Sequence, residues 1–473
     1  MSFSKCSAIL IILLLASSNV CAEEPSPNIQ YYRTRGNVRK LISQTLDGQS
    51  SIRSTWKLSG GQSNQRSKES ILAAESRPRL ISNADLPERL VMVCGTRTVD
   101  EIADVIKALS IINEKRVPKS PAVNLHLITS ADYVLPHLSN VGLPDFVEVN
   151  NMFHSNDVWL RDFGLWVHSP KGLFAVDARR LGDLPALPSV LARMASAELV
   201  VLQDLAENNS GNFGGNVIVT PGDVAVIGST TEPTLREFLD GCGYEKKMVV
   251  VDTDWLEVGH IDELLGFMSL PGEDGQWAIV RASARVAFDL LKSIDQSSFQ
   301  CEMEAAIASL KSISQSPLPE DERYEITEMM TQLSLLNTYL LGRRQTDFEY
   351  TPALISLNET VDVLLDRAVN MIQEVTKETN PNLPEPVVIE LPALFIDGAN
   401  GARSLVPNVV NYVNIDEDLL LPDPLLEIWR VETVKRLKDH GLSSHFIKTL
   451  TYHALGGGLH CATTVLRRPR RPL

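Results

Sequence analysis

The chain has 473 residues, 44% of them apolar and 22% charged, and its formal net charge is −15 at pH 7. This balance is typical of a globular protein whose core is large enough to fold without a metal or a disulfide. Such an acidic surface disfavours nucleic acids and anionic membranes as partners, and it attracts cationic substrates.

The first 22 residues have the pattern of a secretory signal peptide. Lys5 precedes an unbroken apolar run over residues 8–16, and the small residues at 20–22 provide a cleavage point. The run is too short to cross a bilayer, and no later stretch is long and apolar enough to do so. We therefore expect a secreted or periplasmic protein without integral membrane association.

Residues 23–85 are expected to form an N-terminal segment separate from the compact region. Within it, residues 48–70 are rich in Ser, Gly and Gln and poor in apolar residues, which is typical of a flexible linker. The compact region is expected to run from residue 86 to residue 473. Four cysteines remain after the expected cleavage, too few for a disulfide framework: Cys94, Cys242, Cys301 and Cys461.

Strand and helix patterns alternate at the start of the compact region. Residues 89–95 form an apolar run typical of a buried strand, and residues 98–112 carry apolar side chains at helical spacing. Residues 122–128 predict a further strand. Short strand-like segments separated by Gly and Pro turns continue to about residue 290.

A helical region follows over residues 296–380. Apolar side chains recur at helical spacing over 361–375, and a Pro-rich segment at 381–386 ends the helix. Strand-like segments return at 387–389 and 409–415. The pattern predicts a mixed α/β fold with a late helical insertion, and the sequence contains no repeat at a fixed period.

His260 and Asp262 are the first candidates for proton-transfer chemistry. If residues 258–262 are extended, both side chains project from the same face, because side chains alternate along a strand. An imidazole beside a carboxylate suits proton transfer, although such a pair is more often structural. The sequence has no helical H-x-x-x-H pair or cysteine cluster that would complete a zinc site with it.

Asp162 is the second candidate. Leu160 and Phe163 flank it, so its carboxylate is expected to be partly buried, which is costly unless a cation pairs with it. The structural alternative to a functional role is therefore a salt bridge to Arg161 or Arg180.

Cys461 is the third candidate. The glycines at 456–458 allow a tight turn or a close approach to a ligand, and His460 precedes the thiol directly. A neighbouring imidazolium lowers the pKa of a thiol and activates it as a nucleophile. The alternative is a small buried thiol that only fills the core.

Together these side chains suit an attack on a guanidinium group. A guanidinium is always charged and carries five donors, so carboxylates such as Asp162 and Asp262 would hold its edges. A thiolate from Cys461 would attack the central carbon near neutral pH. His260 would protonate the departing ammonia and then activate water.

The sequence resembles the protein-arginine deiminases in their C-terminal catalytic domain, within the wider superfamily of guanidine-modifying enzymes. The resemblance runs from about residue 86 to residue 469 and rests on several separated blocks in the same order. These blocks are Asn156-Asp157-Val-Trp159-Leu-Arg-Asp162, Trp255-Leu-Glu-Val-Gly-His260-Ile-Asp262-Glu263, Leu391-Pro-Ala-Leu-Phe395, Val406-Pro-Asn-Val-Val-Asn411, and residues 451–453 and 460–469.

The resemblance implies a fold and a set of roles. The fold is a five-module α/β-propeller, called pentein-like. The implied catalytic residues are Asp162, His260, Asp262 and Cys461. The implied substrate contacts are Trp159, which stacks on the substrate, and Arg180, which grips the substrate backbone.

The resemblance also raises the question of calcium, which the deimination chemistry itself does not need. Vertebrate members carry calcium-binding acids just after the first catalytic aspartate, where this chain has Phe163, Gly164 and Leu165. A later acidic ligand corresponds to Ile218 or a neighbour, while Asp177 remains as a calcium-ligand candidate. Calcium needs several oxygen ligands, so we expect weak calcium dependence or none.

Other departures concern the N-terminus and the nucleophile loop. Residues 23–85 are too short for the immunoglobulin-like domains of vertebrate members. Leu455 and Gly458 replace polar residues found near the nucleophile in some relatives, which leaves substrate selection beyond the guanidinium open.

The sequence therefore predicts deimination of arginine residues in proteins or peptides to citrulline through a covalent thiouronium on Cys461. One alternative is a deiminase of free arginine or agmatine. Another is a secreted, catalytically silent module that binds arginine peptides. A cysteine peptidase would use the Cys/His pair but leaves the two aspartates unexplained.

Overall fold

The computed structural model describes residues 78–469, apart from 96–97, 117–119, 130–142, 152–156, 182–186, 203, 273–274, 315–329, 331–349 and 399. The expected signal peptide and most of the segment at 23–85 lie outside the described residues, so these two assignments stay predictions. Among the described residues, no helix has both the length and the apolar character needed to cross a membrane.

Five sheets share one arrangement. In each, a central strand has an antiparallel neighbour on one side and a parallel neighbour on the other. In the order antiparallel neighbour, central strand and parallel neighbour, the first sheet consists of β19 (Thr463–Arg468), β2 (Leu86–Val93) and β3 (Asn124–Thr129), and the second of β5 (Gly164–Ser169), β6 (Gly172–Asp177) and β7 (Glu198–Val201). In the same order, the third sheet consists of β8 (Val217–Val219), β9 (Ala225–Gly228) and β10 (Met248–Val251), and the fourth of β11 (Leu265–Ser269), β12 (Trp277–Ser283) and β13 (Val387–Pro392). The fifth sheet consists of β16 (Val413–Ile415), β17 (Asp418–Pro422) and β18 (Ser443–Ile447).

Three further pairings complete the sheets. β4 (Val147–Asn151) extends the first sheet beside β3, and β1 (Arg79–Leu80) pairs with β5. A separate two-stranded sheet joins β14 (Phe395–Asp397) to β15 (Ala402–Ser404).

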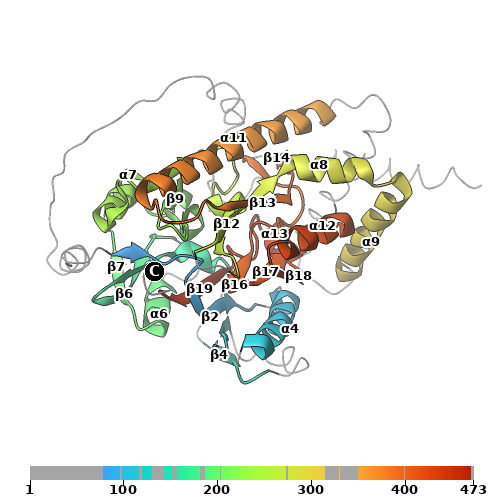
Figure 1. The fold of residues 1–473 in the computed structure, drawn as a ribbon. Coiled ribbons are helices and arrows are strands. Elements are labelled where there is room, and N and C mark those ends of the chain that lie inside the picture. Colours follow the sequence, from blue (N-terminus) through green and yellow to red (C-terminus); the bar gives the residue numbers. More distant parts are fainter. Residues whose placement is uncertain are drawn as a thin grey trace, which may run out of the picture.

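Helices connect the parallel strands, because a parallel pair needs a crossover. In chain order the crossovers contain α4 (Val99–Arg116), α6 (Leu187–Met194), α7 (Pro233–Leu239), the insertion, and α12 (Glu427–Lys438). The insertion between β12 and β13 holds α8 (Ala284–Ser293), α9 (Gln296–Ser314) and α11 (Tyr350–Thr379). Helices α4, α6, α7 and α11 lie around the outside of the strands (Figure 1). The predicted mixed α/β fold with a late helical insertion is confirmed.

Helix α4 shows how the sequence specifies one of these units. Acidic residues occupy its first turn and basic residues its last turn, which complements the helix dipole. Its buried stripe packs with apolar residues of β2 and β3 in one core cluster and consists of Ile102, Val105, Ile106, Leu109 and Ile112.

Helix α11 covers the sheet of β11, β12 and β13. Its apolar stripe, which includes Val361, Leu365 and Ile372, joins the largest core cluster. A buried ion pair fixes the helix on the sheet, because Arg281 of β12 donates to Asp362 of α11 at 2.7 Å. Figure 1 shows α11 running along one side of the molecule.

Two local predictions were wrong. Residues 258–262 are not extended throughout. His260 has an extended backbone, but residues 261–263 form the 3-10 turn η7 (Ile261–Glu263). The backbone amide of His260 donates to the side chain of Glu263 and so stabilises the start of this turn. The strand expected over 409–415 begins only at residue 413. Before it, Asn408 accepts the amide of Val410 and forms a turn instead.

Candidate active site

The candidate site is built from the turns that precede the antiparallel neighbour strand in each of the five sheets that share one arrangement. The 3-10 turn η3 (Leu160–Phe163) leads into β5, η5 (Gly214–Asn216) into β8, and η7 into β11. Asn411 lies in the bend before β16, and Cys461 lies in the turn before β19. Because such a turn precedes the corresponding strand in each of these five sheets, residues distant in sequence meet at one place.

Glycines allow three of these turns to approach closely. A side chain at Gly214 would place a Cβ 2.2 Å from the carbonyl oxygen of Gly164, just after η3. A Cβ at Gly215 would lie 2.6 Å from Nδ1 of His260 and 3.0 Å from a carboxylate oxygen of Asp262. Turn η5 therefore seats against both η3 and η7 only because these positions lack side chains.

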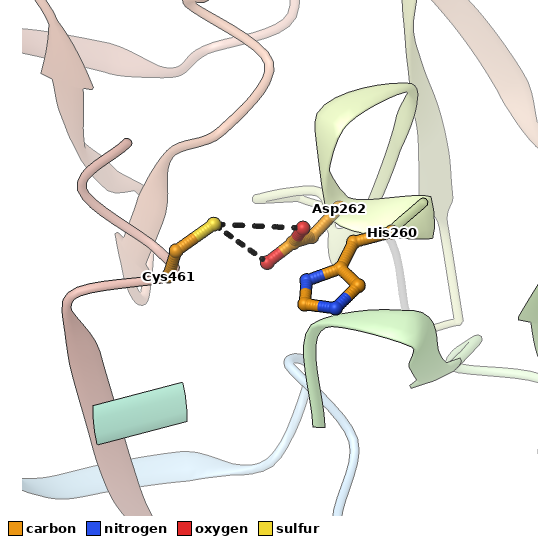
Figure 2. Close-up of side chains that lie close together, drawn as sticks. All are labelled: His260, Asp262 and Cys461. Atoms are coloured by element: carbon orange, nitrogen blue, oxygen red, sulfur yellow. Dashed lines mark hydrogen bonds between the residues drawn. The ribbon is translucent and has the colours of Figure 1, made fainter. Parts of the chain in front are cut away.

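Cys461 lies directly against Asp262. Its Sγ is 3.5 Å from Oδ2 and 3.7 Å from Oδ1 of the carboxylate. Figure 2 shows the sulfur pointing toward this carboxylate, with the His260 ring beside it. One ligand atom from each of the three residues lies within 4.8 Å of the others, and all three side chains are buried.

The charges of this pair are set by burial and by its neighbours. Burial would raise the pKa of Asp262, but the hydrogen bond from Nδ1 of His460 at 2.7 Å and nearby cations hold it below its ordinary value. Burial and the Asp262 carboxylate raise the pKa of the Cys461 thiol well above its ordinary value. In the free protein, Cys461 is therefore a neutral thiol that donates to an ionised Asp262.

Asp162 and His260 face each other across the same space. Oδ1 of Asp162 is 3.9 Å from Nδ1 of His260, and neither atom has a hydrogen-bond partner among the residues that the structure describes. Nε2 of His260 lies 3.1 Å from the carbonyl oxygen of Ser210 and donates to it, which leaves Nδ1 to exchange a proton. Burial raises the pKa of Asp162 to about 6, against the opposing effect of His260 and Arg180.

The two expected substrate contacts lie at the edge of this space. Nε of Arg180 is 3.8 Å from Asp162, and its guanidinium also pairs with Asp157. Of the two salt bridges considered for Asp162, the one to Arg180 is therefore present. Trp159 is half-buried, packs 6.2 Å from the Tyr452 ring, and covers the backbone of Gly457.

Sequence reasoning missed Asn411, and it missed the contacts of two other residues: it considered Arg161 only as a salt-bridge partner of Asp162 and His460 only as the imidazole beside the thiol. The backbone amide of Arg161 donates to the carbonyl of Cys461 at 3.0 Å, and Nε of Arg161 donates to the carbonyl of Gly214 at 3.1 Å. Arg161 therefore connects η3 both to η5 and to the turn that contains Cys461, here called the nucleophile turn. His460 and Asn411 contact Asp262 and Cys461. Asn411 ends one of the quoted family blocks, but nothing local in the sequence marks it as a partner of the thiol.

The positions that correspond to calcium ligands in vertebrate members offer few oxygen donors in this chain. Phe163, Leu165 and Ile218 are buried apolar side chains without oxygen donors. A carboxylate oxygen of Asp177 accepts the backbone amide of Arg179 at 2.7 Å. Within the described ranges, the His, Cys, Asp and Glu side chains form only one group of three that could hold a metal ion, and it is the thiol-containing set of His260, Asp262 and Cys461. Calcium prefers oxygen ligands alone.

Comparison with known proteins places the chain in a family. The sequence model of the protein-arginine deiminases matches residues 215–471, more than half of the chain. The chain belongs to the protein-arginine deiminase family. It is 26% identical to human protein-arginine deiminase type-3 over 315 residues, covering 65% of this chain and 40% of that protein. Mouse protein-arginine deiminase type-4 is 28% identical over 231 residues, covering 46% and 29%.

The chain thus spans about 40% of the length of the type-3 relatives it matches. Among solved structures, it is similar to an agmatine deiminase of C. jejuni, with a TM-score of 0.47 and 14% identity over 83% of this chain and 97% of that one. The agmatine deiminase of Enterococcus faecalis gives a TM-score of 0.47 and 12% identity over 84% and 98%. The match of the family model over residues 215–471 confirms the family expected from the sequence blocks.

Proposed function

We propose that this protein hydrolyses the guanidinium group of arginine residues in proteins or peptides, producing citrulline and ammonia. The observation that carries the proposal is the meeting of Cys461, Asp262, His260 and Asp162 in one buried space, although up to 299 positions separate them in the sequence. Membership of the protein-arginine deiminase family supports the same chemistry.

Two carboxylates would hold the substrate cation. Oδ1 of Asp162 is buried and accepts no hydrogen bond from the described residues, so it offers an acceptor for a guanidinium N–H. Asp262 would give up its contact with the thiol and accept from the opposite edge of the guanidinium. The planar cation offsets the cost of burying two carboxylates, which favours guanidinium over a neutral ligand.

Substrate binding would also activate the nucleophile. A bound cation beside Sγ stabilises the thiolate, so the thiol loses its proton more readily in the complex than in the free protein. His260 takes up this proton in our scheme. The Cys461 thiolate then forms an S–C bond to the guanidinium carbon, and the electron pair of the C=N bond moves to nitrogen.

His260 would complete both halves of the reaction. It gives its proton to one nitrogen of the tetrahedral adduct, the C–N bond breaks, and ammonia leaves a thiouronium on Cys461. His260 then accepts one proton from an attacking water and a C–O bond forms. The C–S bond breaks with its electron pair on sulfur, and the remaining hydroxyl proton passes through solvent to the released ammonia. The products are citrulline and a regenerated thiolate, and water supplies the ureido oxygen.

The architecture and location around this site are part of the proposal. The shared strand order of the five sheets supports a five-module α/β-propeller with the site at its centre. The pattern of the first 22 residues supports export, which sequencing of the N-terminus of secreted protein would test. A mature chain that still begins at Met1 would contradict export by cleavage.

The first experiment measures ammonia release from a blocked arginine peptide. Cys461→Ser should reduce the rate to background while circular dichroism and thermal unfolding stay as in the wild type, because a hydroxyl is a far weaker nucleophile than a thiolate. Cys301→Ser is the matched control, since Cys301 is exposed on α9 and should be dispensable. Near-normal turnover by Cys461→Ser would exclude the proposed mechanism.

The same assay decides the substrate class and the calcium question. Release from the blocked peptide should exceed release from free arginine or agmatine at equal concentration; the reverse order would assign a small guanidine as substrate. Added chelator should leave the rate unchanged, because Phe163, Leu165 and Ile218 lack oxygen side chains and Asp177 alone provides too few ligands for calcium. A loss of activity that calcium restores would contradict this expectation.

A further inference from the structure

Asn411 contacts both Cys461, the proposed nucleophile, and Asp262, the residue whose carboxylate lies beside the thiol. It is 2% exposed and lies in the bend before β16, in the place that corresponds to Asp162, Asp262 and Cys461 in their own turns. Its Nδ2 donates to Sγ of Cys461 at 3.2 Å and to the backbone carbonyl of Asp262 at 3.1 Å. No other residue among those described bonds both to this sulfur and to the backbone of Asp262.

The backbone partners fix the orientation of the Asn411 amide. Its Oδ1 accepts the amide of His460 at 2.8 Å and the amide of Cys461 at 3.3 Å, and backbone N–H groups can only donate. Its Nδ2 faces the Asp262 carbonyl, which can only accept. Only this orientation of the amide satisfies these backbone partners, so the group that points at the sulfur is an N–H donor.

An N–H donor aimed at sulfur stabilises a thiolate more than a thiol. Hydrogen bonds to a charged acceptor are stronger than bonds to a neutral one, so Asn411 favours the ionised form of Cys461. It counteracts the burial and the Asp262 charge, which both disfavour the thiolate. By contrast, the side-chain amide of Asn408, three residues earlier, donates to the carbonyl of Glu263 and accepts from the backbone amide of Val410.

We propose that Asn411 is a catalytic residue, which stabilises the Cys461 thiolate through its side-chain N–H and holds the nucleophile turn against Asp262. This inference rests on the proposed function for its meaning in catalysis. The contact with the sulfur is nevertheless testable without any substrate, through the reactivity of the thiol.

The test measures alkylation of Cys461 by iodoacetamide as a function of pH, read by mass spectrometry of the peptide that contains it. Cys301 is exposed, so all variants carry Cys301→Ser. Asn411→Asp keeps the acceptor oxygen and the shape but replaces the donor with a charged oxygen. We expect its alkylation rate near neutral pH to fall roughly tenfold or more, with the inflection moved to higher pH. Turnover should fall about 10- to 100-fold in kcat, with a smaller change in KM.

Two further variants separate this role from a structural one. Asn411→Ser keeps a shorter donor and should recover part of the lost reactivity. Asn358→Ala is the matched control, because Asn358 is equally buried and bonded to backbone groups of Leu354 and Phe395, with no bond to a residue of the site. It should unfold at a lower temperature but keep the alkylation profile of the wild type.

An Asn411→Asp protein that is alkylated with the wild-type rate and pH profile would overturn the inference. So would unfolding of both Asn411 variants while Asn358→Ala stays folded, because Asn411 would then serve stability alone. If the variants shift alkylation as expected but no guanidine substrate is turned over by the wild type, the proposed function fails and the contact with the thiol stands.

Discussion

At the scale of single residues, the site keeps a carboxylate in a place that is unfavourable for it. Asp162 is 7% exposed, and one of its oxygens has no donor among the described residues. Burial raises its pKa from 3.8 to about 6. The charged form that would hold a guanidinium in the proposed function is thus destabilised while no cation is bound, as is common at sites that bind charged ligands.

Replacing the Asp162 carboxylate should abolish activity but increase the stability of the free protein. Because the folded-state pKa lies above the unfolded one, the native state binds more protons between about pH 4 and pH 6, so stability falls as pH rises through that window. Asp162→Asn removes this penalty and should stabilise the free protein at pH 7 by on the order of 3 kcal/mol while abolishing ammonia release.

Urea unfolding of Asp162→Asn and wild type at pH 7 and at about pH 4 measures this difference, which should shrink at the lower pH. A variant less stable than the wild type at pH 7 would show that Asp162 is a structural partner of Arg180. In the wild type, activity should decline as pH falls through about 6, where Asp162 becomes protonated.

At the scale of elements, the strands position the turns that contain the site residues, and the helices pack against the strands and stabilise them. The site residues lie in short turns directly before strands, so their positions depend on the sheets that follow them. The sheet behind η7 is fixed by α11, through a buried contact in which Arg281 is 1% and Asp362 is 5% exposed. Asp362 also accepts the amides of Ala284 and Arg285 at the start of α8.

Removing the Asp362 carboxylate should therefore destabilise the fold without touching the chemistry. Asp362→Ala leaves Arg281 buried with less compensation, which costs roughly 3–5 kcal/mol for a buried pair. Chemical denaturation should show this loss, and the folded fraction should keep the wild-type pH profile of Cys461 alkylation. A change below about 1 kcal/mol would mean that the neighbouring acids Asp366 and Glu390 compensate fully.

Element prediction from the sequence succeeded where periodicity was strong. The stripe of α11 was visible because burial on one face leaves a regular pattern, and β2 and β3 were visible as apolar runs because both faces of these strands are buried. It failed at residues 260–263 and 409–412, where side chains bond to the local backbone. Such bonds compete with strand formation and leave no apolar period.

At the scale of the whole molecule, five sheets repeat one pattern of strand order that the sequence does not repeat. Each unit preserves topology and burial rather than residue identity, so no fixed period was visible. The site residues Asp162, His260, Asp262 and Cys461 were predicted because the family blocks mark them. Asn411 was missed, as were the contacts of Arg161 with Gly214 and of His460 with Asp262, because these contacts arise only when the turns of different sheets meet.

Labelling of Cys461 by a haloacetamidine tests the central claim most directly, since the reagent carries a planar amidinium beside a carbon that a thiolate can attack. Intact-protein and peptide mass spectrometry should find one label on Cys461, slowed by a blocked arginine peptide and lost in Asp262→Asn. Equal labelling of the exposed Cys301, or labelling of Cys461 that arginine substrates and the Asp262 change leave unaffected, would contradict a guanidinium pocket around this thiol.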